Sequence, residues 1–345
     1  MNKDISDRIK FISFVMTCFI AVYHCMFTLV GINSVDSAIN SSINSMTDTL
    51  AYIAMCWFFS LSGFLLLRNL SFKSYPEKIK RRVKSLLIPY FIWQFGVFAL
   101  TCVMAVLRKN LDFSSEMFKH LFYGVFLMKE WPPDGALWYL YALFFLALLS
   151  PVLLIIFKNK KIGWIFVIAV TFFVYRLNYV DNFITEHIYT YGYLKNIIVY
   201  FPAFLIGAFI GYYSDSSDGS DNIKYLISVL LMSMLFEKLY PGFVNDSIGK
   251  ILPILLLYFM PVTSHMRDRK IYKITFLIYA IHKPLLFVKK YILALMLKIM
   301  PLMSMANIML RLCFLVVTVA VATGIYICLK KVSPKLLKLI TGGRI

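Results

Sequence analysis

The chain has 345 residues, of which 60% are hydrophobic and only 15% are charged, whereas an average soluble domain is about 45–50% apolar and 25% charged. A formal net charge of +19 would suggest a nucleic-acid partner if the protein were soluble. Here the Lys and Arg residues lie in short segments between apolar runs, and no basic stretch is interleaved with aromatic residues in a pattern that suggests base stacking. Composition therefore argues against a soluble enzyme and against nucleic-acid binding, and it predicts an all-α polytopic membrane protein.

Long apolar runs recur along the whole chain, each close to the roughly 20 residues that cross a bilayer as a helix. They lie at residues 9–30, 50–67, 86–107, 136–157, 162–178, 197–213, 223–240, 249–264, 271–295 and 305–329. No soluble segment interrupts them. We therefore expect one integral-membrane domain over residues 1–345, a bundle of about ten transmembrane helices.

Lys and Arg are concentrated in alternate connecting segments. "MNKDISDRIK", "RNLSFKSYPEKIKRRVKS" and "RDRKIYK" are basic, whereas residues 31–49, 180–195 and 242–249 are poor in Lys and Arg. Because positively charged loops stay in the cytoplasm, this pattern predicts that both termini are cytoplasmic and that the three poor segments are outer loops.

Six cysteines occur, all inside apolar runs and with no CxxC pair. This usage is typical of small buried hydrophobic residues. The sequence predicts neither a disulfide framework nor a metal site, and no phosphate-binding loop or hydrolase motif is present.

A histidine stands near the far end of the first apolar run, in "FISFVMTCFIAVYHC" at residues 11–25. His24 follows Ile9 by a rise of about 22 Å along a helix, so we expect it past mid-membrane. Polar side chains in lipid are tolerated where they face the bundle interior or a polar cavity. His24 is therefore either an interfacial residue that caps its helix or a base or nucleophile.

A second histidine lies in "FLIYAIHKPLL" at residues 276–286, where His282 and Lys283 precede Pro284. A proline in a membrane helix frees a backbone carbonyl and allows a kink. Two intramembrane histidines beside a kink suggest the lining of a polar cavity, although His282 alone is as consistent with a structural role.

Small and aromatic residues mark two further positions. Ser62 and Gly63 lie in the middle of the second run, where they allow a ligand, or more often another helix, to approach closely. Trp138 enters the fourth run after "WPPDGAL", a defined loop at the outer face. Trp138 fits either an interfacial belt or an acceptor site.

The third run is preceded by a dense group of cations: Lys78, Lys80, Arg81, Arg82 and Lys84. Such a group serves as a topology signal against anionic lipid headgroups. It would also hold the phosphates of a donor molecule, since Arg binds phosphate bidentately. The sequence alone favours the first interpretation.

The order of these segments resembles the membrane-bound acyltransferase family 3, whose members modify bacterial surface polysaccharides. The similar pieces are V-Y-His24, "FFSLSGFLLLRN", "KRRVKSLLIPY", "ALWYLYALFFLALLSPVL", "YFPAFLIGAFIGY" and "ITFLIYAIHKPLL". The resemblance implies an O-acyltransferase of about ten helices that uses cytoplasmic acyl-CoA, usually acetyl-CoA, as donor substrate. It implies a sugar hydroxyl as acceptor, His24 as the catalytic residue, and Arg81 and Arg82 at the donor side.

The chain departs from the family pattern at two places. Members often carry an arginine 11 positions before the histidine, where this sequence has Ser13. Many also have an R-x-x-R pair, whereas here Arg82 is followed by Ser85, and Arg81 by Lys84, which lacks the bidentate fork. These differences concern donor binding and the identity of the acyl group.

The sequence thus predicts transfer of an acyl group, acetyl in the first place, to a cell-surface or exported polysaccharide or its lipid-linked precursor in the bacterial cytoplasmic membrane. His24 would be base or acylated nucleophile, with His282 as a relay. Arg81, Arg82 and Lys84 would hold the donor, and Trp138, Ser62 and Gly63 would border the acceptor or cavity. Alternatives are a transporter or flippase for a lipid-linked glycan, or a polysaccharide polymerase. The oligomeric state is left open.

Overall fold

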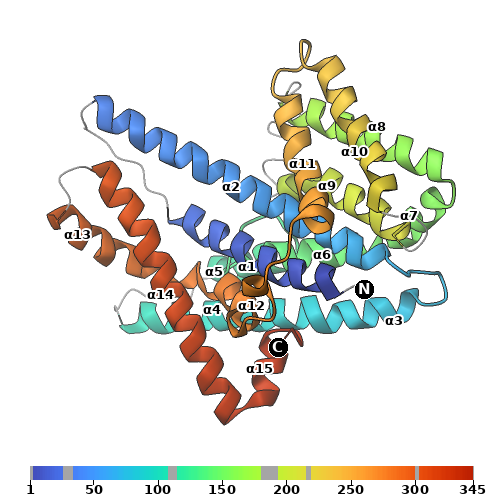
Figure 1. Ribbon diagram of the computed structural model, residues 1–345. Helices are drawn as coiled ribbons and strands as arrows, with labels where there is room; N and C mark the ends of the chain where they lie inside the picture. Colours follow the sequence, from blue (N-terminus) through green and yellow to red (C-terminus); the bar gives the residue numbers. More distant parts are fainter. Residues whose placement is uncertain are drawn as a thin grey trace. The chain divides into compact units, whose positions relative to one another are not determined.

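The computed structural model describes residues 3–25, 34–107, 115–179, 193–214, 219–299 and 303–344. Every regular element within these ranges is helical, and none of them contains a strand (Figure 1). The all-α expectation is therefore confirmed. The chain forms two compact units, one of Met1–Met55 with Pro261–Ile345 and one of Cys56–Met260. The long helix α2 (Ser34–Leu67) contributes its first part to the first unit and its end to the second.

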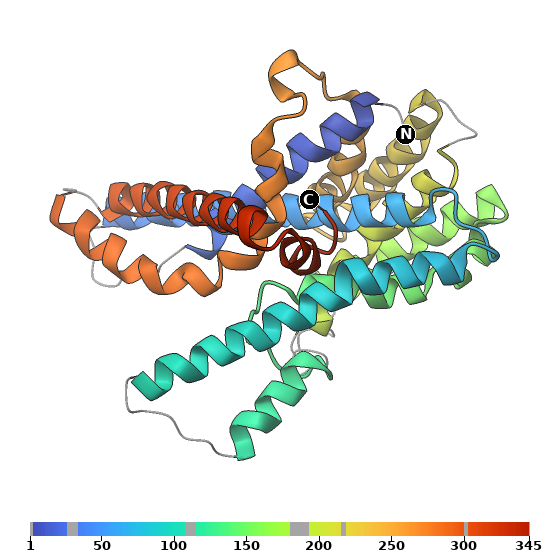
Figure 2. The ribbon, with the colours of Figure 1, turned by 90° about the horizontal axis from the view of Figure 1, so that it is seen from below.

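The first unit is organised around α1 (Lys3–His24), which packs against α12 (Thr275–Ile281) and α14 (Met303–Val332). α13 (Lys289–Ile299) lies alongside α14 in both views (Figures 1 and 2). The remaining elements are short helices: η3 (Ser264–Met266), η4 (Lys270–Ile274), η5 (Pro284–Val288) and α15 (Pro334–Ile340).

The second unit follows the end of α2 with ten further elements within its described residues. They are α3 (Tyr75–Arg82), the π-helical turn η1 (Val83–Leu87), α4 (Ile88–Leu107), α5 (Ser115–Val125), α6 (Trp138–Leu148), α7 (Ser150–Phe157), α8 (Lys160–Tyr179), α9 (Leu194–Tyr212), α10 (Gly219–Phe236) and α11 (Phe243–Phe259). α9 packs against α8 and α11, and α10 packs against α11. η1 lies against α6.

Within the described residues, fewer helices than the sequence predicts have the length and hydropathy of a membrane span. In the described residues, five helices are long and apolar enough to cross a bilayer, or up to seven spans if each of two bent helix pairs counts as one. The expected count of about ten is not confirmed. α10 offers only a short apolar stretch at Asn222–Phe236, and α1 carries Asp4, Asp7, Arg8 and Lys10 in its first half. The end of the first predicted run, residues 26–30, lies outside the described residues.

Two segments predicted as outer loops are helical. Residues 34–49 belong to α2. Three of their polar side chains, Asp36, Asn40 and Thr47, recur at helical spacing and are buried rather than solvated as in a loop. Residues 243–249 begin α11, where Asp246 is buried. The third predicted outer segment lies outside the described residues over 180–192.

Two predicted spans are broken. The run at 136–157 is divided into α6 and α7, which are bent by 50° at Leu149, next to Pro151. The run at 271–295 is divided into four short pieces, and α12 ends at Ile281 directly before His282 and Lys283. The helix is therefore interrupted just before Pro284, as a proline in a membrane helix allows, and His282 lies directly after the last residue of α12.

Two glycines allow a close contact between helices in the second unit. A Cβ built on Gly63 would lie 2.1 Å from the Phe204 carbonyl oxygen, and one on Gly207 would lie 1.9 Å from the Ser60 carbonyl oxygen. α2 and α9 therefore touch backbone to backbone, as small residues allow in membrane helix pairs. The Ser60 hydroxyl donates a 2.7 Å hydrogen bond to the Ala203 carbonyl across the same contact.

Candidate functional site

His24 and His282 face each other in the first unit. Their rings stack with centroids 5.1 Å apart and planes 29° apart. The ring of Tyr23, the preceding residue, lies 4.9 Å from that of His24. Within the described part of the chain, the His24 ring makes no hydrogen bond. The two histidines singled out by the sequence, 258 positions apart, are thus brought together, and the ring nitrogens of His24 stay available.

The His282 side chain is held in one tautomer. His282 is fully buried, and its Nδ1 lies 2.7 Å from the Tyr279 carbonyl oxygen. A carbonyl only accepts, so Nδ1 must carry the hydrogen and the neutral ring presents Nε2 as an acceptor. Nε2 is buried and has no hydrogen-bond partner among the described residues. A buried acceptor in this state is suited to take a proton or a hydrogen bond from a group that arrives.

Local structure explains why the two rings meet. His24 is the last residue of α1, and His282 follows the last residue of α12. α1 and α12 pack against each other, so their ends place both side chains together. At a helix end the carbonyls of the last turn have no helical partner. The Tyr279 carbonyl, three residues before His282, is one of these, and the imidazole satisfies it.

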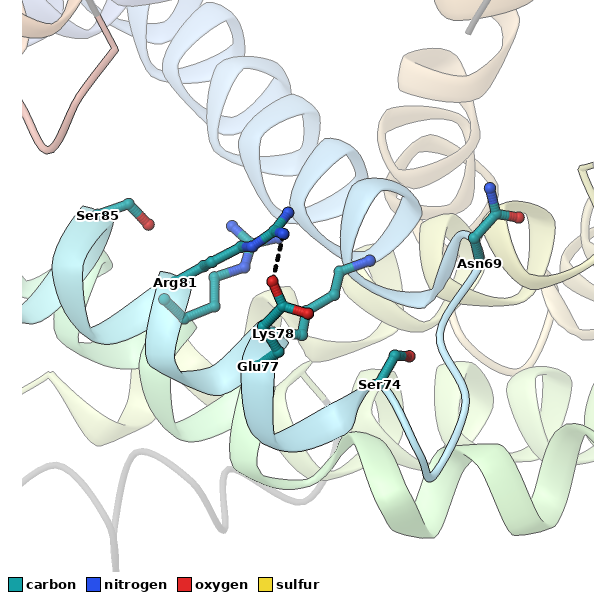
Figure 3. A pocket seen from close by; sticks show the side chains of 7 residues that line it. Asn69, Ser74, Glu77, Lys78, Arg81 and Ser85 are labelled. Atoms are coloured by element: carbon teal, nitrogen blue, oxygen red, sulfur yellow. Dashed lines mark hydrogen bonds and ion pairs between the residues drawn. The ribbon is translucent and has the colours of Figure 1, made fainter.

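The second unit contains a basic cavity of about 360 Å³, within the roughly 300–1,000 Å³ of small-molecule sites. It lies along α3 and the first part of η1, beside the loop after α2. Its lining residues are Asn69, Ser74, Glu77, Lys78, Arg81, Arg82 and Ser85. In Figure 3 the labelled α3 side chains Glu77, Lys78 and Arg81 project from one side of the helix, toward the loop that carries Asn69.

The three cations of this cavity differ in their partners. Arg81 pairs with Glu77, one helical turn earlier, and both side chains are exposed. Lys78 donates a 2.9 Å hydrogen bond to the Arg68 carbonyl oxygen. The guanidinium of Arg82 is half-buried and makes no hydrogen bond to any residue that the structure describes. Arg82 is therefore the cation of this cavity best placed to bind an incoming anion, because it loses no existing hydrogen bond by doing so.

Lys84 is not part of the cavity lining. It is exposed and belongs to the π-helical turn Val83–Leu87. Lys78 lines the cavity instead, at the helical spacing of four residues before Arg82. A π-turn shifts the direction of the following side chains and is often found at functional sites. The basic sequence alone does not show which of its cations face inward.

The residues predicted to border the acceptor are tightly packed in the second unit. Trp138 is only 7% exposed, and its ring lies 6.0 Å from that of Tyr193. The Ser62 hydroxyl is 2.9 Å from the Tyr139 hydroxyl, which donates to the Phe58 carbonyl. Gly63 faces the α9 backbone. Helix packing accounts for Gly63, and an acceptor role for these three residues stays a prediction.

Several polar residues in apolar helices were not singled out by sequence reasoning. Asp246 and Lys250 form a buried ion pair on α11, with side chains 6% and 1% exposed. Arg311 is 2% exposed on α14. Their sequence signal is a single charge inside or at the edge of an apolar run, which is costly in lipid and calls for a partner. Their partners lie one helical turn away or in distant segments, which a one-dimensional pattern does not show.

One carboxylate outside the helices is held by backbone groups. Glu237, between α10 and α11, accepts 2.8 Å hydrogen bonds from the amides of Gly242 and Val244. These bonds favour the charged form and lower the pKa of Glu237 below its ordinary value. Glu237 thereby supports the start of α11, whose first amides have no helical partner.

Comparison with known proteins supports the resemblance drawn from the sequence. A family model described as an acyltransferase domain matches residues 8–327, nearly the whole chain and both units. No curated protein and no solved structure matches the chain. With the apolar helices and the matched range together, the chain belongs to acyltransferase family 3 and is a multi-pass membrane protein.

Proposed function

We propose that this protein transfers an acyl group from acyl-CoA to a hydroxyl of a cell-surface or exported polysaccharide, or of its lipid-linked precursor. The family supports acyl transfer to a sugar-like hydroxyl. The acyl group is acetyl, the donor is cytoplasmic, and the protein resides in the bacterial cytoplasmic membrane with both termini inside. The observation that carries the proposal is the stacked pair of His24 and His282 in a chain of this family.

In this mechanism His24 removes the proton from the acceptor hydroxyl as its oxygen attacks the thioester carbonyl, or first takes the acyl group itself. The bond to sulfur breaks, and the CoA thiolate leaves with a proton. His282 offers the bare Nε2 as a relay for the proton that His24 gains. Because two imidazolium rings at 5.1 Å would repel, the pair carries one added proton at a time.

The basic cavity is the proposed site for the phosphates of the donor. Lys78, Arg81 and Arg82 supply three positive charges against the one negative charge of Glu77. Phosphate oxygens fit the forked guanidinium of Arg82, which is free of other hydrogen bonds among the described residues. Lys84, which the sequence also suggested, lies outside the lining and would contribute only to the surrounding potential.

The catalytic assignment is tested with membranes that contain the protein, radiolabelled acetyl-CoA and the cell's own glycan. His24→Ala should lower turnover by about 100-fold or more, the usual contribution of a general base. His120→Ala is the matched control, because His120 is exposed on α5 and pairs with Glu130. Both variants must accumulate in the membrane to the wild-type level. Unchanged acylation by His24→Ala would overturn the assignment.

The donor site is tested by comparing Arg82→Ala with Lys84→Ala, two cations two residues apart of which only Arg82 lines the cavity. Loss of one charge-assisted hydrogen bond to phosphate should raise the KM for acetyl-CoA about tenfold, with little change in kcat. Lys84→Ala should stay within about twofold of wild type. An equal effect of both variants would show that the cavity does not bind the donor.

A transporter or flippase for a lipid-linked glycan is separated from the enzyme by mass spectrometry of the surface glycan. Cells that lack the protein should keep the glycan at its normal amount and length but without the acetyl mass. A much lower amount of surface glycan, with unchanged acylation of the glycan that remains, would instead indicate transport.

A further inference from the structure

A second polar centre in the first unit is built around Arg311, in the apolar helix α14. Arg311 is 2% exposed. Its guanidinium donates four hydrogen bonds, to oxygens on three helices. The acceptors are the Asn307 side chain at 2.9 Å, the Thr47 hydroxyl at 2.9 Å, the Val22 carbonyl at 3.1 Å and the Asn44 side chain at 2.5 Å. These bonds occupy four of the five N–H groups of the guanidinium.

All four acceptors are uncharged. A buried cation in a membrane helix is costly, and a structural one is usually paired with a carboxylate. Here the carboxylate that acts on Arg311 electrostatically, Asp48, is an exposed residue of α2 and is not among its hydrogen-bond partners. The rigid, planar guanidinium therefore serves as a junction that fixes several oxygens in one geometry.

One of these oxygens belongs to the last turn of α1. The Val22 carbonyl lies two residues before His24, where helix carbonyls have no partner further along the helix. It accepts from Arg311 at 3.1 Å and from the Cys25 amide at 3.2 Å. Arg311 thus caps the helix end that carries His24. A helix end without this bond would fray, and the imidazole would move with it.

Further polar contacts set the register between α2 and α14. The side-chain amide of Asn307 donates to the side-chain oxygen of Asn40. The backbone amide of Ser304 donates to the carboxylate of Asp36 at 3.1 Å. Asp36, Asn40 and Asn44 are spaced four residues apart and so lie along one face of α2. The Arg311 junction is therefore itself braced, because the two helices that carry it cannot slide without breaking several hydrogen bonds.

We propose that Arg311 is a positioning residue for His24. Its guanidinium joins the end of α1 to α2 and α14 and so holds the imidazole in its place beside His282. This proposal rests on the function proposed above, because it assigns to Arg311 an effect on the reaction at His24. Thr47 and Asn44 take part as the oxygens that orient the guanidinium.

The test compares Arg311→Ala, Arg311→Lys and Thr47→Val in the acetyl-transfer assay. The matched control is Thr318→Val, which removes a buried hydroxyl of α14 that bonds only its own helix, at the Phe314 carbonyl. We expect Arg311→Ala to lower kcat about 100-fold, the scale of a small misplacement of a catalytic group, with the KM for acetyl-CoA within about threefold. The kcat of Arg311→Lys should lie between those of Arg311→Ala and the wild type, since Lys keeps the charge but lacks the forked guanidinium. Added guanidinium should restore part of the turnover of Arg311→Ala but none of His24→Ala.

A second readout does not depend on acyl transfer. The rate at which diethyl pyrocarbonate carbethoxylates His24, measured by mass spectrometry of the His24 peptide, reports how accessible the imidazole nitrogens are. This rate should change several-fold in Arg311→Ala and remain at the wild-type value in Thr318→Val. If Arg311→Ala does not accumulate in the membrane, Thr47→Val decides, with an expected loss of about tenfold in kcat for one hydrogen bond.

The outcomes separate the two proposals. Wild-type turnover and wild-type carbethoxylation in the Arg311 and Thr47 variants would overturn the positioning role while leaving the catalytic role of His24 intact. Full activity of His24→Ala would instead overturn the catalytic assignment of His24 on which the proposed mechanism rests. Changed carbethoxylation in Arg311→Ala would then still establish that Arg311 holds His24.

Discussion

Alanine at Gly207 should weaken the contact between α2 and α9 in the second unit. The new Cβ would lie 1.9 Å from the Ser60 carbonyl oxygen, whereas real Cβ atoms essentially never come within 3.0 Å of another heavy atom. The obstructing atom belongs to the backbone, so no side chain can rotate away. The two helices must separate locally by about 1 Å.

Separation affects two energy terms. Overpacking of a well-packed contact costs about 1–3 kcal/mol. The Ser60–Ala203 hydrogen bond, 2.7 Å long, crosses the same contact and contributes about 1 kcal/mol. We therefore expect Gly207→Ala to lower the free energy of unfolding by about 2–4 kcal/mol. Gly96→Ala on α4 is the matched control, because no atom lies within 4 Å of its added Cβ. That substitution should stabilise the helix by about 0.5–1 kcal/mol.

The assay is unfolding of the detergent-purified protein, followed by intrinsic fluorescence during a thermal ramp. Gly207→Ala and Gly96→Ala make the same chemical change, so helix propensity cancels in the comparison and the packing effect remains. Opposite shifts of the melting temperature support the reasoning. Equal shifts, or a Gly207→Ala protein as stable as wild type, would refute the close approach of the two backbones.

Two further predictions concern charges in the second unit. Lys250→Met should destabilise the protein by about 3–5 kcal/mol because it leaves Asp246 buried without its cation, and adding Asp246→Asn should recover most of the loss; unfolding of the single and double variants decides, and an additive double variant would contradict the pairing. Glu237 has a lowered pKa in the folded protein, so its hydrogen bonds to Gly242 and Val244 stabilise the fold above the unfolded pKa of about 4.3 and are lost as the pH falls through the folded value. Melting temperatures measured from pH 7 downward should therefore fall less in Glu237→Gln than in wild type, and parallel curves would argue against this role.

Much of the helical architecture could be predicted from hydrophobicity alone, because apolar runs near 20 residues long have few alternatives to a helix in lipid. The start of α2 could not. Asp36, Asn40 and Thr47 indicate a loop by composition, yet all three are buried, and Asp36 and Thr47 hydrogen-bond residues of α14. Their partners lie more than 260 positions away in the chain, so the helix depends on tertiary contacts that no local pattern contains.

The candidate site was predictable to a similar extent. An imidazole in an apolar run is conspicuous, and both His24 and His282 could be recognised, although only the structure brings their rings to 5.1 Å. The proposed donor site is different. Lys78, Arg82 and Lys84 are all cations of one basic stretch, and their residue types do not distinguish them. Their positions along the helix, together with the π-turn at Val83–Leu87, place Lys84 outside the cavity.

The unpaired nitrogen of His282 is the feature that most favours chemistry over packing. Thr318 shows how a polar group is accommodated cheaply in these helices, by donating to its own helix at the Phe314 carbonyl. The Nδ1–H of His282 likewise donates to a nearby carbonyl, that of Tyr279. Its Nε2, however, is buried without a hydrogen-bond partner among the described residues. An unsatisfied buried acceptor costs about 1–3 kcal/mol, and an apolar ring such as Phe would fill similar space without that cost. Under the proposed mechanism, a nitrogen in this position, stacked beside His24, would find its partner only during the reaction, in the proton that moves when the acceptor hydroxyl attacks.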